Sequence, residues 1–129
     1  MVVTIIVAGK NDIACNVLKY LTTKEKDENK ILALPNENDS GIDNWQKSFK
    51  KTALDNNIKI IDLKDAYKIE NSIFLSCEFD KIINPNLFAT KKIYNIHFSK
   101  LPQYKGMYTS CLPILLNEKE TGVTLHEID

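Results

Sequence analysis

Hydrophobic residues occur in short runs that alternate with amphipathic segments along the chain. The first run, VVTIIVA at 2–8, is rich in β-branched residues and stops at Gly9, which is typical of a strand buried on both faces. Apolar residues then recur at helical spacing from Asp12 to Thr23, and Asn11 or Asp12 is well placed to cap this helix. A strand, a glycine turn and a helix form the opening half of a βαβ unit.

The rest of the chain continues this alternation. Further strands are predicted at 30–35, 58–63, 72–76, 91–98 and 122–128, and further helices at 42–56 and 110–117. Parallel strands need crossover connections, and helices supply them. The sequence therefore predicts an α/β fold, a Rossmann-like three-layer sandwich with a mostly parallel sheet.

Length and charge narrow the class of protein. A chain of 129 residues has room for one domain, which we expect to occupy 1–129. The 17 basic residues are all lysines and are balanced by 17 acidic residues. Phosphate contacts favour a basic excess and base recognition favours arginine, so a nucleic-acid partner is not expected. No apolar run has membrane-spanning length and no signal peptide is evident, so we expect a cytoplasmic protein without a membrane partner.

The three cysteines, Cys15, Cys77 and Cys111, lie in largely apolar contexts. An odd number of cysteines in such surroundings fits buried reduced thiols better than a disulfide framework or a metal site. No metal is therefore expected.

The turn GKND at 9–12 lies between the first predicted strand and the first predicted helix. Open α/β sheets bind ligands at such turns, where backbone N–H groups and the helix dipole favour anions, and Lys10 adds a positive charge. The match to a dinucleotide-binding G-x-G-x-x-G is weak, because Asn11 and Ala14 stand where glycines would be needed. A plain strand-to-helix turn is an equally good interpretation of this stretch alone.

A second polar cluster follows the predicted strand at 91–98. Asn95 and His97 are two residues apart, so strand alternation puts them on the same face. A histidine alone in a strand is more often a core residue than a functional one. An amide beside an imidazole on a buried strand costs free energy unless both have partners or a ligand, which favours a site at the end of this strand.

The stretch NIHFSKLPQYKGMYTS at 95–110, followed by GVTLHEID at 122–129, resembles the formyltransferase superfamily that uses 10-formyltetrahydrofolate. Members of that superfamily carry N-x-H, then a Ser-Leu-Pro-x-Tyr-x-Gly loop, then G-V-T-x-H. The opening GKNDIA at 9–14 and the variant KGMYTS at 105–110 are most similar to the sugar N-formyltransferases, which act on nucleotide-linked amino sugars. The resemblance implies a role in lipopolysaccharide or glycan biosynthesis.

The resemblance also implies a set of site residues. Asn95 matches the amide that donates to the oxyanion, and His97 matches the imidazole that stabilises the same oxygen or shuttles the proton. His126 matches a family histidine near the site. The loop implied to hold 10-formyltetrahydrofolate contains Phe79, Lys81, Ile82 and Ile83. The residues implied to contact the nucleotide-linked amino sugar are Gly9, Lys10, Asn11, Asp12, Tyr104, Lys105, Met107 and Tyr108.

The third catalytic residue of the family is an aspartate in a segment G-x-D-x-G, which would follow Asp129. The resemblance therefore implies a formyltransferase domain that is incomplete at its C-terminal end. Loss of that carboxylate is expected to lower the rate by roughly three or more powers of ten. Two alternatives stay open: a formyltransferase acting on methionyl-tRNA or glycinamide ribonucleotide, and an inactive remnant that only binds folate or nucleotide or assembles with another chain, including a second copy of itself.

Overall fold

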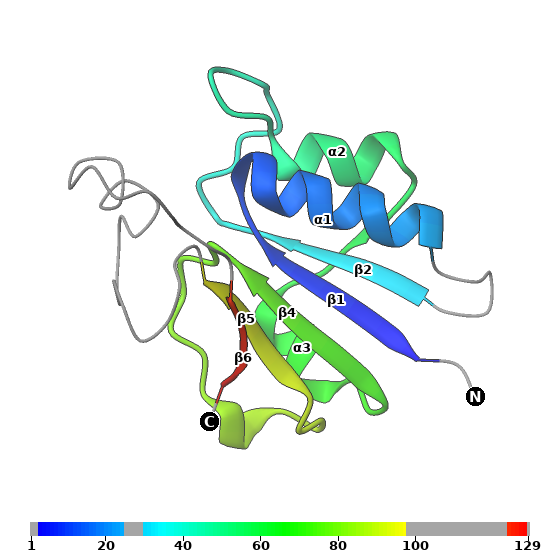
Figure 1. Ribbon diagram of the computed structural model, residues 1–129, viewed down its shortest axis with the longest axis vertical. Coiled ribbons are helices and arrows are strands. Elements are labelled where there is room, and N and C mark those ends of the chain that lie inside the picture. Colours follow the sequence, from blue (N-terminus) through cyan, green and yellow to red (C-terminus); the bar gives the residue numbers. More distant parts are fainter. Residues whose placement is uncertain (1–2, 25–29, 98–123, 129) are drawn as a thin grey trace.

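The computed structural model describes residues 3–24, 30–97 and 124–128 of the chain (Figure 1). The elements in these segments are β1 (Thr4–Gly9), α1 (Asn11–Lys24), β2 (Lys30–Pro35), α2 (Phe49–Asp55), β3 (Lys59–Ile60), α3 (Leu63–Lys68), β4 (Ser72–Cys77), the 3-10 turn η1 (Pro85–Leu87), β5 (Ile93–His97) and β6 (Thr124–Glu127).

The strands form one sheet in the order β3-β2-β1-β4-β5-β6. All neighbouring strands are parallel except β5 and β6, which are antiparallel. The strand order reverses at β1, which pairs with β2 on one side and with β4 on the other. This confirms the predicted α/β fold with a mostly parallel sheet.

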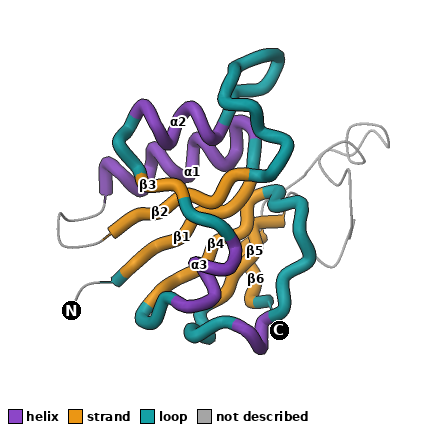
Figure 2. The backbone as a smooth tube through the Cα atoms, turned by 180° about the vertical axis from the view of Figure 1, so that it is seen from behind, coloured by secondary structure: helices purple, strands orange, loops and turns teal. Residues whose placement is uncertain are grey.

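Helices cover both faces of the sheet (Figures 1 and 2). On the α1–α2 face, side chains such as Val7, Cys15 and Phe49 are completely buried in one apolar cluster. On the α3 face, Phe74 and Ile93 belong to a second cluster that includes Ala66 of α3. The alternation of β1 residues between the two clusters explains its uninterrupted apolar sequence, and the three-layer arrangement is confirmed.

The helix predicted at 42–56 is wrong in its first half, because α2 begins only at Phe49. In the preceding loop, side chains accept hydrogen bonds from backbone N–H groups that would donate to backbone carbonyls in a helix. Asp43 Oδ1 accepts from Ser48 N at 2.8 Å, and Asn44 Oδ1 accepts from Gln46 N at 3.1 Å. Ser48 then caps α2, since its Oγ accepts from Lys51 N at 3.0 Å.

The strand predicted at 58–63 is also too long, because β3 is confined to Lys59–Ile60. Asp62 and Asp65 form a capping box that starts α3, a helix that the apolar pattern did not predict. The predicted strands at 30–35, 72–76 and 91–98 are confirmed as β2, β4 and β5 with small differences in their ends. The helix predicted at 110–117 lies outside the described residues.

Cys15 and Cys77 are buried free thiols, as predicted, whereas Cys111 lies outside the described residues. Burial raises the pKa of Cys77 to about 12. None of the helices in the described segments is long and apolar enough to cross a membrane.

Candidate active site

The loops that leave β1 and β4 meet at the point where the strand order reverses. Gly9 pairs with Cys77 in the sheet register, and Lys10 N donates to the Cys77 carbonyl at 3.2 Å. A Cβ atom at Gly9 would lie 1.8 Å from that carbonyl oxygen, so this crossing requires glycine. Open α/β sheets bind ligands at such a crevice beyond the carboxyl ends of their strands.

The start of α1 is tied to two other loops rather than capped by its own side chains. Asn11 Nδ2 donates to Glu78 Oε2 at 3.3 Å, and both residues have positive φ, 65° and 61°. Asp12 Oδ1 accepts from Lys47 N at 2.9 Å, and Asp12 N donates to Gln46 Oε1 at 3.2 Å. The expectation that Asn11 or Asp12 caps the helix is therefore wrong.

A buried amide fixes the loop after β4. Asn36, only 2 % exposed, follows β2 directly, and its backbone N donates to the Gly9 carbonyl at 3.1 Å. Its Nδ2 donates to the Glu78 carbonyl at 3.1 Å, and its Oδ1 accepts from Asp80 N at 3.2 Å. Sequence reasoning missed Asn36, although its position immediately after a strand that ends at Pro35 was the available signal.

Of the four residues predicted to hold the folate, Phe79 lies between the two positions that contact Asn36, and Lys81, Ile82 and Ile83 follow them along the loop. Phe79 and Ile83 pack against the apolar cluster of the α3 face. The Phe79 and Phe74 rings are arranged edge to face, with their centroids 6.3 Å apart. Lys81 Nζ binds Glu37 Oε1 at 2.6 Å, and this hydrogen bond raises the pKa of Lys81. Ile82 is 99 % exposed at the loop tip. The loop therefore has an anchored apolar base and an open apolar tip.

Asn95 lies in a row of residues that crosses the sheet. The register pairs Ala8 with Ser76, Ser76 with Asn95, and Asn95 with His126 of β6. Asn95 is two residues from Ile93 and therefore lies on the α3 face, where Phe79 and Ile83 also pack. The predicted oxyanion donor and the predicted folate loop thus share one face of the sheet.

The Asn95 amide is in contact with the ring of His126. Asn95 Nδ2 lies 3.3 Å from His126 Nε2, and His126 Nδ1 lies 3.1 Å from the Glu127 carbonyl oxygen. A carbonyl oxygen only accepts, so Nδ1 carries the hydrogen, and Nε2 accepts from the Asn95 amide. His126, which sequence reasoning treated as a secondary candidate, is thereby brought directly beside Asn95.

The backbone of His97 is described, and it occupies the last position of β5, paired with Thr124. The prediction that its side chain shares a face with Asn95 stays a prediction. Tyr104, Lys105, Met107 and Tyr108 lie outside the described residues. In the part of the chain that is described, no cluster of three or more His, Cys, Asp or Glu side chains could hold a metal ion.

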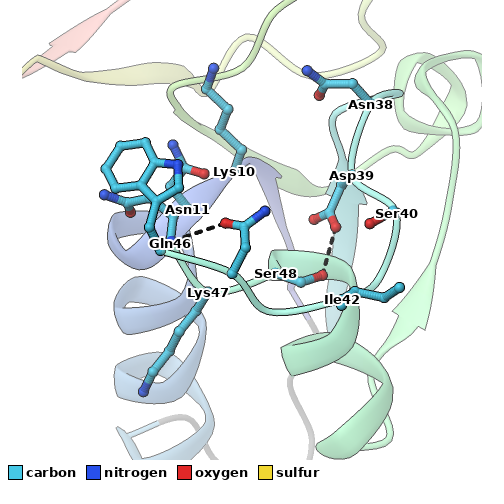
Figure 3. A pocket seen from close by; sticks show the side chains of 11 residues that line it. Lys10, Asn11, Asn38, Asp39, Ser40, Ile42, Gln46, Lys47 and Ser48 are labelled. Atoms are coloured by element: carbon cyan, nitrogen blue, oxygen red, sulfur yellow. Dashed lines mark hydrogen bonds between the residues drawn. The ribbon is translucent and has the colours of Figure 1, made fainter.

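A polar pocket of about 260 Å³ opens beside the start of α1 (Figure 3). Lys10 and Asn11 line it from the end of β1, and the loop at 38–48 supplies the remaining lining residues. Of the four predicted substrate residues in the GKND turn, Lys10 and Asn11 therefore border this pocket, whereas Gly9 and Asp12 are not among its lining residues. Together, the fold and the site define a class: this is a doubly wound α/β domain, and such domains bind ligands at the carboxyl edge of the sheet.

Comparisons with known proteins agree with this class. No protein-family model matches the chain. The methionyl-tRNA formyltransferase of Malacoplasma penetrans is 30 % identical in an alignment of 134 positions, gaps included, and the alignment covers 94 % of this chain and 41 % of that protein. The sugar 3-N-formyltransferase WlaRD, solved in the presence of dTDP and 5-N-formyltetrahydrofolate, is 53 % identical with a TM-score of 0.88, covering 98 % of this chain and 46 % of WlaRD.

An N-formyltransferase from Helicobacter canadensis, solved with folinic acid and dTDP-3-aminofucose, is 47 % identical with a TM-score of 0.87. The match covers 98 % of this chain and 47 % of the Helicobacter canadensis chain. The chain belongs to the formyltransferase superfamily, as its motifs predicted. It spans less than half the length of each of these relatives.

Proposed function

We propose that this chain is the catalytic domain of a sugar N-formyltransferase, which moves a formyl group from 10-formyltetrahydrofolate to the amine of a nucleotide-linked amino sugar. The observation that carries the proposal is the 53 % and 47 % identity, over 98 % of the chain, to two structures solved with formyl-folates and dTDP ligands. In this proposal the reaction takes place in the cytoplasm and serves glycan biosynthesis.

The loop at 79–83 suits a formyl-folate. Within the described residues, the backbone groups of Lys81, Ile82 and Ile83 make no hydrogen bond, so their N–H and C=O groups are available to a heterocycle with donors and acceptors on its edge. The exposed Ile82 side chain offers apolar surface to a flat ring. The hydrogen bonds from Asn36 to Glu78 and Asp80 fix the start of this loop, so the loop loses less conformational entropy when a ligand binds.

Asn95 has the chemistry needed at the formyl carbon. The folate supplies the formyl group, whose oxygen gains negative charge as the amine attacks. One N–H of the Asn95 amide donates a hydrogen bond to His126 Nε2, and the second N–H can donate a hydrogen bond to the formyl oxygen. In this proposal His97 stabilises the same oxygen or carries the proton released by the amine.

The methionyl-tRNA formyltransferases are the second candidate class, favoured by the 30 % identical relative. Two observations favour a sugar substrate. The identity to this relative, 30 %, is lower than the 53 % identity to WlaRD, and the chain contains no arginine, the residue best suited to nucleic-acid recognition. An inactive remnant that binds folate or nucleotide without turnover is the third candidate, and an activity assay separates it from the other two.

The test is a formyl-transfer assay with 10-formyltetrahydrofolate, comparing a dTDP-linked 3-amino sugar with methionyl-tRNA. Because the chain spans 46 % of WlaRD, the assay is run on the 129-residue chain and on a chimera that adds the remaining length of WlaRD. We expect the chimera to formylate the amino sugar and an Asn95→Ala chimera to lose roughly 10²–10³-fold in kcat. Transfer to methionyl-tRNA alone, or no transfer by the chimera, would refute the proposal.

A further inference from the structure

Ser76 is a buried polar residue whose side chain has no hydrogen-bond partner among the described residues. It is 8 % exposed and lies one residue before the end of β4. The other buried polar residues of the described segments each use their side chains in a hydrogen bond: Asn36, Ser48, Thr52, Ser72 and Thr90. An unpartnered hydroxyl in such surroundings costs free energy and calls for an explanation.

Two other serines show what a partner does for a buried hydroxyl. Ser72 Oγ, on the same strand as Ser76, donates to the Ile69 carbonyl at 2.9 Å. Ser48 Oγ donates to Asp39 Oδ1 at 2.6 Å. Burial by itself would raise the pKa of Asp39, but the hydrogen bonds from Ser48 and from backbone N–H groups outweigh it and lower the pKa below its ordinary value. Each of these hydroxyls stabilises its surroundings, whereas the Ser76 hydroxyl gives the fold no such return.

The Ser76 hydroxyl is not sealed inside the protein. Within the described residues, no completely enclosed side-chain nitrogen or oxygen atom lacks a partner, so the unpartnered Ser76 Oγ can be reached from outside. Exposure increases along the row that crosses the sheet: Ala8 is completely buried, Ser76 is slightly exposed and Asn95 is partly buried. The row therefore opens to ligands at Ser76 and Asn95.

Ser76 lies on the same face of the sheet as Asn95. Phe74, two residues earlier in β4, belongs to the apolar cluster of the α3 face, so strand alternation puts Ser76 on that face as well. Ser76 and Asn95 are register partners on neighbouring parallel strands, so their backbones are about 5 Å apart. Phe79, at the base of the proposed folate loop, packs on this face too. Ser76 is thus close to both the proposed folate loop and the proposed oxyanion donor.

The Asn95 amide nitrogen is directed away from Ser76, toward β6. Its Nδ2 lies 3.3 Å from His126 Nε2, and His126 is the register partner of Asn95 on the side opposite Ser76. On the β1 side of Ser76, Ala8 contributes only a methyl group. A carbonyl oxygen bound above Ser76 is therefore within reach of two donors, the Ser76 hydroxyl and the remaining Asn95 N–H, and such an oxygen accepts two hydrogen bonds.

We propose that Ser76 is a second oxyanion donor, whose hydroxyl donates a hydrogen bond to the formyl oxygen beside Asn95. This assignment rests on the proposed function and adds a residue to its reaction centre. The amine nitrogen bonds to the formyl carbon as the C=O electron pair moves to the oxygen. The pair returns as the bond from that carbon to N10 of the folate breaks, and the proton lost by the amine ends on N10. Ser76 keeps its own proton and stabilises the charge on the oxygen between these two events.

The test uses two stable folate analogues that differ only in the formyl group, 10-formyl-5,8-dideazafolate and 5,8-dideazafolate. Calorimetry measures how strongly the 129-residue chain prefers the formylated analogue. We expect Ser76→Ala to reduce this preference about threefold or more, because one hydrogen bond to the formyl oxygen is lost. In the WlaRD chimera, kcat should fall at least about tenfold, since the charge on this oxygen grows as the amine attacks. Ser76→Thr keeps a hydroxyl and should keep most of the preference and the rate.

Ser72→Ala is the matched control, on the same strand and the same face. It removes the hydrogen bond to the Ile69 carbonyl, so we expect a lower melting temperature with an unchanged preference and rate. Ser76→Ala should instead melt no lower than the unaltered chain, because its hydroxyl has no partner to lose.

Two results would overturn the inference. If Ser76→Ala keeps both the preference and the rate, or if it loses as much stability as Ser72→Ala, the hydroxyl does not act on the formyl group. The proposed function still stands in either case when the unaltered chimera transfers formyl groups. If neither analogue binds and the chimera transfers no formyl group, both the inference and the proposed function are overturned.

Discussion

Asn11 and Glu78 hold each other across the point where the strand order reverses, through an amide-to-carboxylate hydrogen bond of 3.3 Å. Each residue adopts a left-handed backbone conformation close to the end of a strand: Glu78 directly follows β4, and Asn11 lies two residues beyond β1. The loops that follow β1 and β4 therefore form one unit. Asn36 is hydrogen-bonded to this unit at Glu78, and the pocket borders it at Lys10 and Asn11. A change in either loop should be felt by the other.

The first prediction concerns the closest approach within this unit. Gly9→Ala places a methyl group 1.8 Å from the Cys77 carbonyl oxygen, so it must push β1 and β4 apart. We expect a loss of about 3 kcal/mol or more in the free energy of unfolding, measured with urea.

Gly41→Ala is the control for this change. Its φ of 83° is strained for alanine, but the added Cβ would meet only Lys50 Cδ at 3.8 Å. We expect a smaller cost of about 1 kcal/mol. Equal losses at the two positions would mean that conformational strain, rather than the contact with Cys77, decides the effect at Gly9.

The second prediction concerns Asn36. Asn36→Asp keeps the shape of the side chain but removes the donor to the Glu78 carbonyl. We expect a loss of about 1–3 kcal/mol in stability, because a buried carbonyl is left without its partner. Folinic acid should bind more weakly, whereas dTDP affinity should change little. Asn16→Asp, an exposed change on α1, is the control, and an unchanged folinic acid affinity in Asn36→Asp would argue against a role for this loop in folate binding.

The third prediction concerns pH. The folded-state pKa of Asp39 lies below its ordinary value of 3.8, so the carboxylate stabilises the fold above that pH and the contribution is lost as the pH falls through the folded pKa. Asp39→Asn should be less stable than the unaltered chain at about pH 7 and should lose less stability between about pH 5 and pH 2. Urea unfolding across this range measures both, with Glu70→Gln as an exposed control. Parallel pH profiles for Asp39→Asn and the unaltered chain would refute the prediction.

The fourth prediction concerns His126, the partner of the Asn95 amide. His126→Ala removes the acceptor that orients Asn95, so kcat for formyl transfer by the WlaRD chimera should fall by about tenfold, less than the 10²–10³-fold expected when the donor itself is removed. Folinic acid affinity should stay unchanged, and His126→Gln, which keeps an acceptor, should recover part of the rate. A loss of affinity equal to the loss of rate would instead indicate a binding role for His126.

The sequence predicted the layers of the fold well because they follow from strong local signals. β-branched runs bounded by glycine or proline mark buried strands, and the motif around Asn95 marks the family. Residues 42–48 of the loop at 38–48 were predicted to be helical because the spacing of Trp45 and Phe49 is compatible with a helix. The competing hydrogen bonds of Asp39 and Asp43 decide otherwise, and they depend on contacts that spacing does not reveal.

The site was predicted as residue types, but not as an arrangement. Strand alternation puts Asn95 on one face of its own strand, yet the row that joins Ala8, Ser76, Asn95 and His126 depends on register between strands that are far apart in the chain. Asn36 and the pocket loop escaped notice for the same reason, since their roles arise only when β2 lies beside β1. The short capping signal Asp62–Asp65 could have revealed α3 and was overlooked.

The pairing of β1 with two partners has a consequence for how the molecule is made. β1 and β2 are separated by a single helix, so they can associate as soon as Pro35 has left the ribosome. The other edge of β1 pairs only with β4, so Gly9 meets the Cys77 carbonyl only after another forty or so residues have been synthesised, with the loop-closure entropy that such a separation costs. Until then the nascent chain exposes one unpaired edge of its central strand, and the crevice between the ends of β1 and β4 does not yet exist.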